Sequence, residues 1–270
     1  MKFAEYPVDT IFAPTDILLK DGATGTKKVV GSDLPYAIFD GVPMMHNNIY
    51  RGVNLGSSYT EAQRNAVSSG TFTGLWIGDY WTIGGIQWII VDFDYWGGTT
   101  HHLLVMPRTG HYKGPVHPDV VAATGIRKTA LMSNAVYPGT DSFQSLFNNL
   151  GFSHTIISRQ GWNTQQALHA SAVDIQTVAD VLSQGMVIGS NPINSEPSEV
   201  NGTVSRTNDS RQLSYFRMGG KMPLTSGQVS WLSDQTTGYH FSTIDDRMLI
   251  TDARRDTSTN VAVLVYSLRG

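Results

Sequence analysis

Cysteine is absent from this sequence of 270 residues. A disulfide framework, a thiolate metal site and a thiol nucleophile are therefore all excluded. The absence fits a protein made in a reducing cytoplasm, where disulfides do not persist. Stability must then come from side-chain packing or from association of subunits.

Charge is also scarce, and neither sign dominates. Asp, Glu, Lys and Arg make up 15% of the residues, and the formal net charge is −3. Binding to nucleic acid phosphates needs an excess of Lys and Arg, so we expect no nucleic acid partner. There is no run of about 18 apolar residues, and residues 1–16 lack the apolar core of a signal peptide. We therefore expect no membrane span and no secretory leader.

The usual motifs of catalysis and cofactor binding are missing too. There is no P-loop, no G-x-G-x-x-G after a predicted strand and no HExxH pair. Ser133, Ser153 and Ser158 lie outside any G-x-S-x-G elbow, so they cannot be joined to scattered histidines as a triad. The sequon at Asn201 is expected to be part of a polar loop. We predict no catalytic, cofactor-binding or metal-binding residues, and hence no enzyme.

What the sequence does contain is an aromatic segment at residues 74–107, with four of the six tryptophans. Strands are expected at residues 75–83, 86–96 and 100–106. Gly84 and Gly85 separate the first two, and glycines can take the positive φ values of a tight hairpin turn. The pattern predicts consecutive antiparallel strands held in register by aromatic pairs.

Helices are expected on both sides of this segment. Thr60 and Gln63 form a capping-box pattern, and Gly70 lies where a helix C-terminus favours glycine. Further helices are expected at residues 141–151, where apolar residues recur three and four apart, and within residues 164–184.

The last third of the chain is dominated by strand patterns. Strands are expected at residues 213–218, 228–232, 239–244, 248–251 and 261–268. Strands at both ends with helices between them predict an α+β fold, with a mostly antiparallel sheet and a few flanking helices.

The first 45 residues differ from the rest of the chain. Residues 16–21 and 26–30 are expected to be short strands around a glycine turn, with little apolar surface for a core. A hairpin of this kind docks on its own body or on another chain. We therefore predict an N-terminal attachment segment at residues 1–45 and an α+β domain at residues 46–270.

Two aspartates offer the first candidate chemistry. Asp92 and Asp94 lie two apart, so on a strand both carboxylates would face the same side, about 7 Å from each other. Such a pair could flank a glycosidic bond, with Trp96 as a sugar platform. More commonly, acidic pairs at the end of a strand are solvated or cap neighbouring turns.

Histidines offer the second candidate. His101 and His102 are adjacent, and adjacent strand residues point to opposite faces, so one metal ion could not easily bind both. His111 and His117 could in principle add ligands. The simpler expectation is one inward histidine with its hydrogen bonds made, and one outward histidine.

The C-terminal region offers a charged run and two aromatic residues. The run at residues 252–256, DARRD, could recognise a carboxylate or a charged partner, although such runs are more often solvated turns. Trp231 and Tyr239 are expected to belong to the core rather than to a sugar platform.

Segments within residues 45–107 match a known family in order and spacing. They are MHNNIYRG at 45–52, NLGSS at 54–58, GTF at 70–72, IGDYWTI at 77–83, DFDY at 92–95 and HHLLVMP at 101–107. Together they resemble phage and prophage proteins of Gram-positive bacteria that are identified as head fibre or minor structural proteins. Later segments at 153–159 and 185–189 are also similar, whereas residues 252–256 lack the proline of the family ending.

This resemblance implies a non-enzymatic virion structural protein, a head fibre or capsid decoration protein on the virion surface. Residues 16–29 resemble the start of many phage fibre proteins, which implies attachment to a capsid or tail protein and a homo-oligomer, expected to be a trimer. The family ending is similar to C-type-lectin-like folds. Two alternatives remain open: a tail fibre module that binds a cell-surface glycan, and a glycan-cleaving enzyme that uses Asp92 and Asp94.

Overall fold

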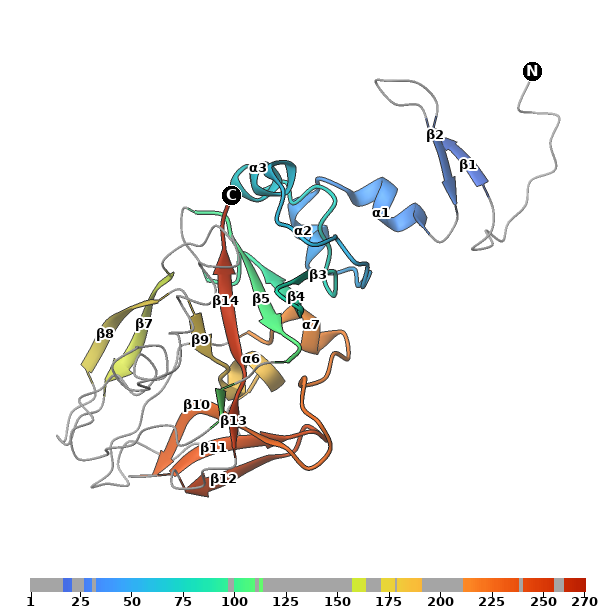
Figure 1. Cartoon of the computed structure of the whole chain (residues 1–270). Helices are drawn as coiled ribbons and strands as arrows, with labels where there is room; N and C mark the ends of the chain where they lie inside the picture. Colours follow the sequence, from blue (N-terminus) through green and yellow to red (C-terminus); the bar gives the residue numbers. More distant parts are fainter. Residues whose placement is uncertain are drawn as a thin grey trace, which may run out of the picture.

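The fold combines α and β structure, with more strand than helix (Figure 1). The computed structural model describes residues 17–20, 27–30, 33–96, 100–109, 112–113, 157–163, 171–177, 179–190, 211–237, 240–254 and 260–270. The α+β class and the mostly antiparallel pairing expected from the sequence are both confirmed. In the part of the chain that is described, no helix is long and apolar enough to cross a membrane.

The first five-stranded sheet is antiparallel throughout, in the order β3-β4-β5-β14-β9. Its strands are β3 (Tyr80–Ile83), β4 (Ile86–Phe93), β5 (Leu103–Pro107), β9 (Ala179–Val181) and β14 (Leu264–Leu268). Every residue of β5 and β14 is buried, so both faces of the sheet are covered at its centre.

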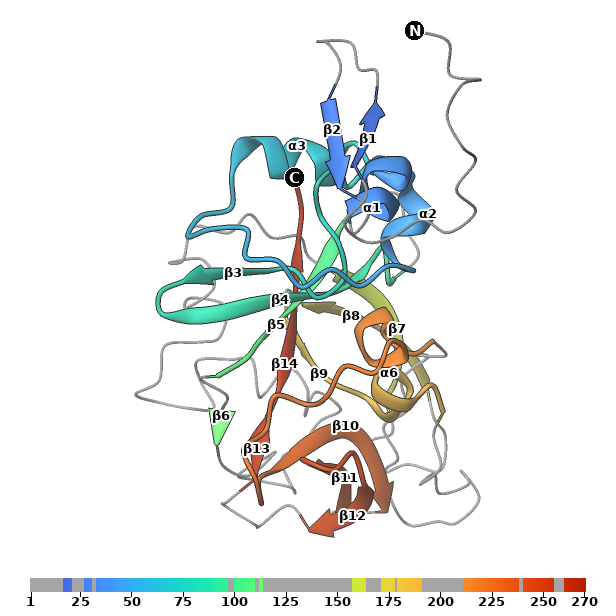
Figure 2. The same cartoon turned by 90° about the vertical axis from the view of Figure 1, so that its right-hand side faces the viewer.

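The second five-stranded sheet has the order β12-β11-β10-β13-β6, with one parallel pair between β10 and β13. Its strands are β6 (Tyr112–Lys113), β10 (Val229–Thr237), β11 (His240–Asp245), β12 (Ile250–Arg254) and β13 (Val261–Ala262). β13 runs into β14 through Val263, so one stretch of chain links the two sheets (Figure 2).

Two hairpins and five short helices complete the described structure. The hairpins are β1 (Ile17–Lys20) with β2 (Lys27–Val30), and β7 (Ile157–Asn163) with β8 (Ser171–Thr177). The helices are α1 (Leu34–Phe39), α2 (Pro43–His46), α3 (Glu61–Ser68), α6 (Gln184–Ile188) and α7 (Ser214–Arg217). In both views β1 and β2 lie at one end of the molecule and β11 and β12 at the other (Figures 1 and 2).

Several local predictions are confirmed. The β1–β2 hairpin forms, and Thr60 is the N-cap of α3, with both hydrogen bonds of the capping box. Gly84 and Gly85 have φ of +62° and +76°, and Ile83 pairs with Ile86 across the two-residue turn that they form. Of the five strand segments expected in the last third, the four from residue 228 onward are found, as β10, β11, β12 and the consecutive strands β13 and β14.

Three local predictions are wrong. Residues 164–184 were expected to contain a helix, but β8 and β9 occupy 171–177 and 179–181, and α6 begins only at Gln184. The β-branched residues of β8 alternate with period two, which favours a strand. The strand expected at residues 213–218 is instead α7 with its two caps, and four successive residues, 213–216, are buried without alternation. Residues 75–79 lie before β3 rather than in it, and Gly78 among them has φ of +83°, outside the range of an extended strand. The helix expected at residues 141–151 lies outside the described residues.

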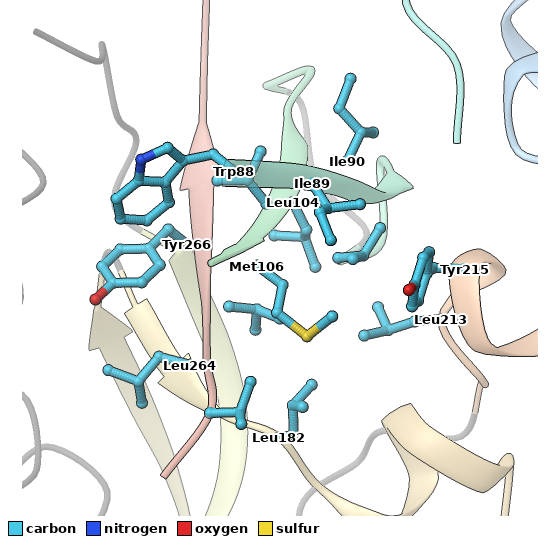
Figure 3. Packing of buried hydrophobic residues seen from close by; sticks show 14 of the residues in the cluster. Trp88, Ile89, Ile90, Leu104, Met106, Leu182, Leu213, Tyr215, Leu264 and Tyr266 are labelled. Atoms are coloured by element: carbon cyan, nitrogen blue, oxygen red, sulfur yellow. The ribbon is translucent and has the colours of Figure 1, made fainter. Parts of the chain in front are cut away.

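The core joins the first sheet to residues from later in the chain (Figure 3). Trp88 and Tyr266 meet edge to face, with ring centroids 5.4 Å apart. Leu213 and Tyr215 lie on one side of Met106, and Leu264 and Tyr266 lie on the other. The segment that contains α7 is therefore part of the core around β4 and β5, although more than 100 residues separate it from them.

Candidate functional site

The residues behind the resemblance gather around one edge of the first sheet, and His46 is the first of them. Its side chain is fully buried at the end of α2. The ring stacks on Trp76 with centroids 4.2 Å apart. Its Nδ1 lies 2.6 Å from the carbonyl oxygen of Leu75, and its Nε2 lies 3.2 Å from the amide nitrogen of Gly41. Burial lowers the pKa of His46, opposed by the hydrogen bond to Leu75.

Asn47 pairs with the end of β4 as a neighbouring strand would. Its Nδ2 donates to the carbonyl oxygen of Phe93 at 2.7 Å, and its Oδ1 accepts from the Phe93 amide at 2.9 Å. The same Oδ1 accepts from Oγ of Ser214, and Arg217 donates to the carbonyl oxygen of Asn47. One side chain thus joins α2, β4 and α7.

Arg51 and Asp79 form a buried ion pair next to β3. Arg51 donates from Nη2 to Oδ2 of Asp79 at 2.6 Å and to the carbonyl oxygen of Gly74 at 2.8 Å. The amides of Val53 and Trp76 donate to the same carboxylate, whose exposed fraction is zero. Burial raises the pKa of Asp79 above its ordinary value, and the Arg51 guanidinium and the amides of Val53 and Trp76 oppose part of this rise.

Glycine at position 78 allows a close approach by Tyr50. A Cβ atom at this position would lie 2.2 Å from Cε2 of Tyr50, and the φ of Gly78 is +83°. Tyr50 is also bridged to Ile77 through the backbone, and Asn54 is bridged to Tyr80. Residues 50–56 therefore run beside β3 in parallel.

Asp92 and Asp94 do not form a pair of carboxylates on one face. β4 has a register shift between Ile90 and Asp92, and it ends at Phe93, so Asp94 leaves the strand with φ of +47°. Asp92 is fully buried, and both its oxygens bond to Arg211, at 2.8 and 3.1 Å. The amide of Ser214 also donates to Asp92 at 2.7 Å. Burial raises the pKa of Asp92, and Arg211 lowers it.

Asp94 instead binds the two histidines that follow β4. Its Oδ2 lies 2.8 Å from Nδ1 of His101, and its Oδ1 accepts from the amide of His102 at 2.9 Å. His101 is exposed, whereas His102 is buried and stacks on Trp96. The two rings thus lie on opposite sides of the chain, as adjacent residues do. Across the ranges that the structure describes, no three His, Asp or Glu side chains are placed to hold a metal ion.

The tryptophans are mostly interior. Those at 76, 81, 88 and 231 are at most 1% exposed, and Trp96 is half-buried. Trp231 therefore belongs to the core, as expected. Trp162 is in β7, where side chains are not described, and the same is true of Ser158, Asp252 and Arg254 in their strands. Other candidates lie outside the described residues: Ser133, Ser153, His111, His117, Asn201, Tyr239, Arg255 and Asp256.

Sequence reasoning missed Arg211, Ser214 and Arg217. Arg211 and Ser214 bind Asp92 from 119 and 122 residues away, and Arg217 binds Asn47 from 170 residues away. No local pattern marks contacts over such separations.

Comparison with known proteins identifies no relative of this chain. No family model, no curated protein and no solved structure matches the chain.

Proposed function

We propose that this chain is a non-enzymatic structural protein of a phage virion, a head fibre or capsid decoration protein attached through its N-terminal segment. The observation behind the proposal is that the residues of the resemblance serve interior contacts. His46, Asn47, Arg51, Asp79 and Asp92 each have buried hydrogen bonds or ion pairs within the chain. This is the arrangement of a structural scaffold.

The N-terminal hairpin supports the assignment of an attachment segment. β1 and β2 lie beyond α1, away from both five-stranded sheets (Figure 1). Among residues 33–45, none whose exposure is described is buried, and His46 is the first buried residue in the described chain. A two-stranded hairpin is marginally stable by itself, so a partner that covers it would stabilise it. We propose that this partner is a capsid or tail protein.

Exposed apolar side chains near the attachment segment support a homo-oligomer. Among the described residues, the large apolar side chains with high exposure are Ile38, Val42, Met44, Tyr50, Val53 and Leu249. Five of these six are within residues 38–53. The charged side chains of this stretch are engaged internally, Asp40 with the amide of Gly74 and Arg51 with Asp79. A second copy could cover such a surface without bringing like charges together, and a trimer remains our expectation.

The geometry of the two aspartates argues against the glycan-cleaving alternative. Glycoside hydrolysis needs two carboxyl groups that both reach the sugar. Asp92 is fully buried and bound to Arg211 and Ser214, whereas Asp94 binds His101 and His102. If the chain cleaved host cell-wall polysaccharide and Asp94→Asn abolished the turnover, the non-enzymatic proposal would be wrong.

A tail module that binds a glycan is the other alternative. Its sugar platform would need outward tryptophans, and four of the six are in the core. We also propose that the C-terminal region is similar to C-type-lectin-like folds. The parallel β10–β13 pair and the final strand β14 are the elements to compare with such folds.

Immunogold labelling of purified particles tests the proposal directly, with antibody raised against residues 46–270. We expect gold over the head. Gold at the tail tip would favour the glycan-binding alternative, and replacing the exposed aromatic residues should then reduce host adsorption. Particles without label would overturn the virion assignment.

A further inference from the structure

The junction between residues 33–45 and the body contains a buried histidine whose two ring nitrogens have opposite partners. The carbonyl oxygen of Leu75 can only accept, so Nδ1 of His46 must bear a hydrogen atom. The backbone amide of Gly41 can only donate, so Nε2 must present its lone pair. Only the neutral ring with hydrogen on Nδ1 satisfies both neighbours.

A second proton on the ring would place two donors against each other. Protonated Nε2 would face the amide hydrogen of Gly41 at a heavy-atom distance of 3.2 Å. The ring has little freedom to turn away, because it stacks on Trp76 and meets Phe72 and Phe93 edge to face. The part that can move is the segment containing Gly41, since its neighbours from 33 to 45 are not buried where their exposure is described.

The charged groups around His46 act in both directions. Asp40, at the end of α1, and Asp79 favour the protonated ring, whereas Arg51 disfavours it. Burial is the largest effect, and it keeps the pKa of His46 below its ordinary value of 6.5. In the open state the Gly41 amide has left Nε2, so water can reach this nitrogen and the pKa rises toward its ordinary value of about 6.5.

We propose that His46 is an acid-sensitive contact, and that protonation of its ring releases Gly41 and with it residues 33–45 from the body. The contacts that would open with it include the hydrogen bond from the Gly74 amide to Asp40, at 2.7 Å, and the bond from the Tyr36 hydroxyl to the Tyr50 carbonyl, at 3.1 Å. The inference needs no virion. If the virion proposal holds, it gives the attachment segment a junction that responds to pH.

The direction of the effect follows from proton linkage. Between the pKa of the closed state and about 6.5, the open state binds a proton that the closed state does not. The opening equilibrium therefore rises by up to about tenfold for each pH unit below about 6.5. Above this pH the contact is fully stable, and below the pKa of the closed state the effect levels off.

Hydrogen exchange on the purified chain measures the opening, with rates corrected for the intrinsic pH dependence of exchange. From pH 7.5 to pH 5.5 we expect protection in residues 33–45 to fall by up to about tenfold, while protection in β3, β4 and β5 stays constant. His46→Gln should lose this pH dependence, because the glutamine amide does not titrate. His101→Gln is the matched control, since His101 is exposed and should leave the pH dependence unchanged. His102 is also buried, and its effect would be seen in residues 94–106 instead.

Two results would overturn the proposal: protection of residues 33–45 that does not change with pH in the wild type, or the same change in His46→Gln. If the glutamine variant does not fold, nitrogen NMR of histidine in the wild type decides. A hydrogen on Nε2 of His46 at pH 7.5 would contradict the proposal, and a hydrogen on Nδ1 would support it. All of these results are independent of whether the particles are labelled in the immunogold experiment.

Discussion

Residues 33–45 and residues 46–56 are neighbours in the chain, but they are attached to the body in different ways. The first stretch has exposed or half-buried side chains where exposure is described. It contacts the body through single hydrogen bonds, such as the one between Asp40 and Gly74, and through the ring of Tyr36, which meets Trp76 edge to face. The second has a fully buried histidine, a side-chain pairing with Phe93 and a buried ion pair. A few residues therefore separate a stretch that can detach from one that belongs to the core.

The difference has a physical origin in hydrogen-bond partners. Backbone amides of residues 51 and 55 donate to Ile77 and Tyr80, so the stretch extends the first sheet beside β3. Buried polar groups in that stretch bond to partners elsewhere in the chain, such as Leu75 for His46 and Asp79 for Arg51. Removing one partner would leave the other without a hydrogen bond at a site that excludes water. The stretch from 33 to 45 does not face this penalty, because its polar groups can reach water.

The largest effect is expected from the buried ion pair that holds the second stretch. Asp79→Asn would remove the charge opposite Arg51 and place an amide hydrogen among donors. We expect a loss of about 3 kcal/mol in the free energy of unfolding, measured by urea denaturation.

Asp94→Asn is the matched control, because Asp94 is half-exposed and its partner His101 is 46% exposed. For this pair we expect a loss below about 1 kcal/mol. If both variants lost the same free energy of unfolding, Asp79 would be more accessible to water than its burial in the structure indicates.

Exposure of the first stretch predicts an effect on association rather than on folding. Met44 is 80% exposed, and a glutamate there should weaken contacts with a second copy while leaving the fold intact. We expect the dissociation constant to rise by about 100-fold, or about 2.7 kcal/mol, measured by sedimentation.

Leu249→Glu serves as control, since Leu249 is 54% exposed and lies outside residues 38–53. A wild-type chain that is monomeric at high concentration would contradict the homo-oligomer. If both variants weakened association equally, the interface would not be specific to residues 38–53.

Close packing of Tyr50 on Gly78 gives a sharper test of the second stretch. Gly78→Ala forces a methyl group into the ring of Tyr50, whereas Gly74→Ala, with φ of +75°, meets no atom within 4 Å. Both variants are strained by about 1–2 kcal/mol because of their positive φ. Gly78→Ala should lose about 1–2 kcal/mol more through overpacking.

A double-mutant cycle isolates the cause of that extra loss. Adding Tyr50→Ala to Gly78→Ala should recover the free energy of unfolding that Gly78→Ala loses through overpacking, because the ring that clashes with the new methyl group is then absent. If the losses of the two single variants simply add, the ring of Tyr50 does not lie over Gly78.

The hairpin turn and the helix cap could be predicted from the sequence, because each depends on residues that are close together in the chain. Gly84 and Gly85 permit the hairpin turn, and Thr60 with Gln63 makes the capping box. In contrast, α7 was predicted as a strand. Its first amide is held by Asp92, 122 residues earlier, and contacts over such distances override local propensity.

The candidate site was harder to predict than the fold elements. Asp92 and Asp94 match the spacing of a carboxylate pair, but β4 ends at Phe93 and Asp94 leaves the strand with φ of +47°. Sequence reveals neither this end of the strand nor the register shift before Asp92. The opposite orientations of His101 and His102 could be predicted, because adjacent side chains along an extended chain point to opposite sides. Arg211 could not be found at all, since its role depends on the tertiary position of Asp92.

The smallest effect is expected far from the junction, at the start of α3. Thr60 accepts from the Gln63 amide at 3.3 Å, and Oε1 of Gln63 accepts from the Thr60 amide at 2.9 Å. Thr60→Ala should lower the free energy of unfolding by about 1 kcal/mol, and Thr60→Ser should restore most of it, since serine offers the same oxygen. Because α3 belongs to the body, neither variant should change the protection of residues 33–45 against exchange. A change there would mean that the two stretches are coupled more tightly than their separate hydrogen bonds indicate.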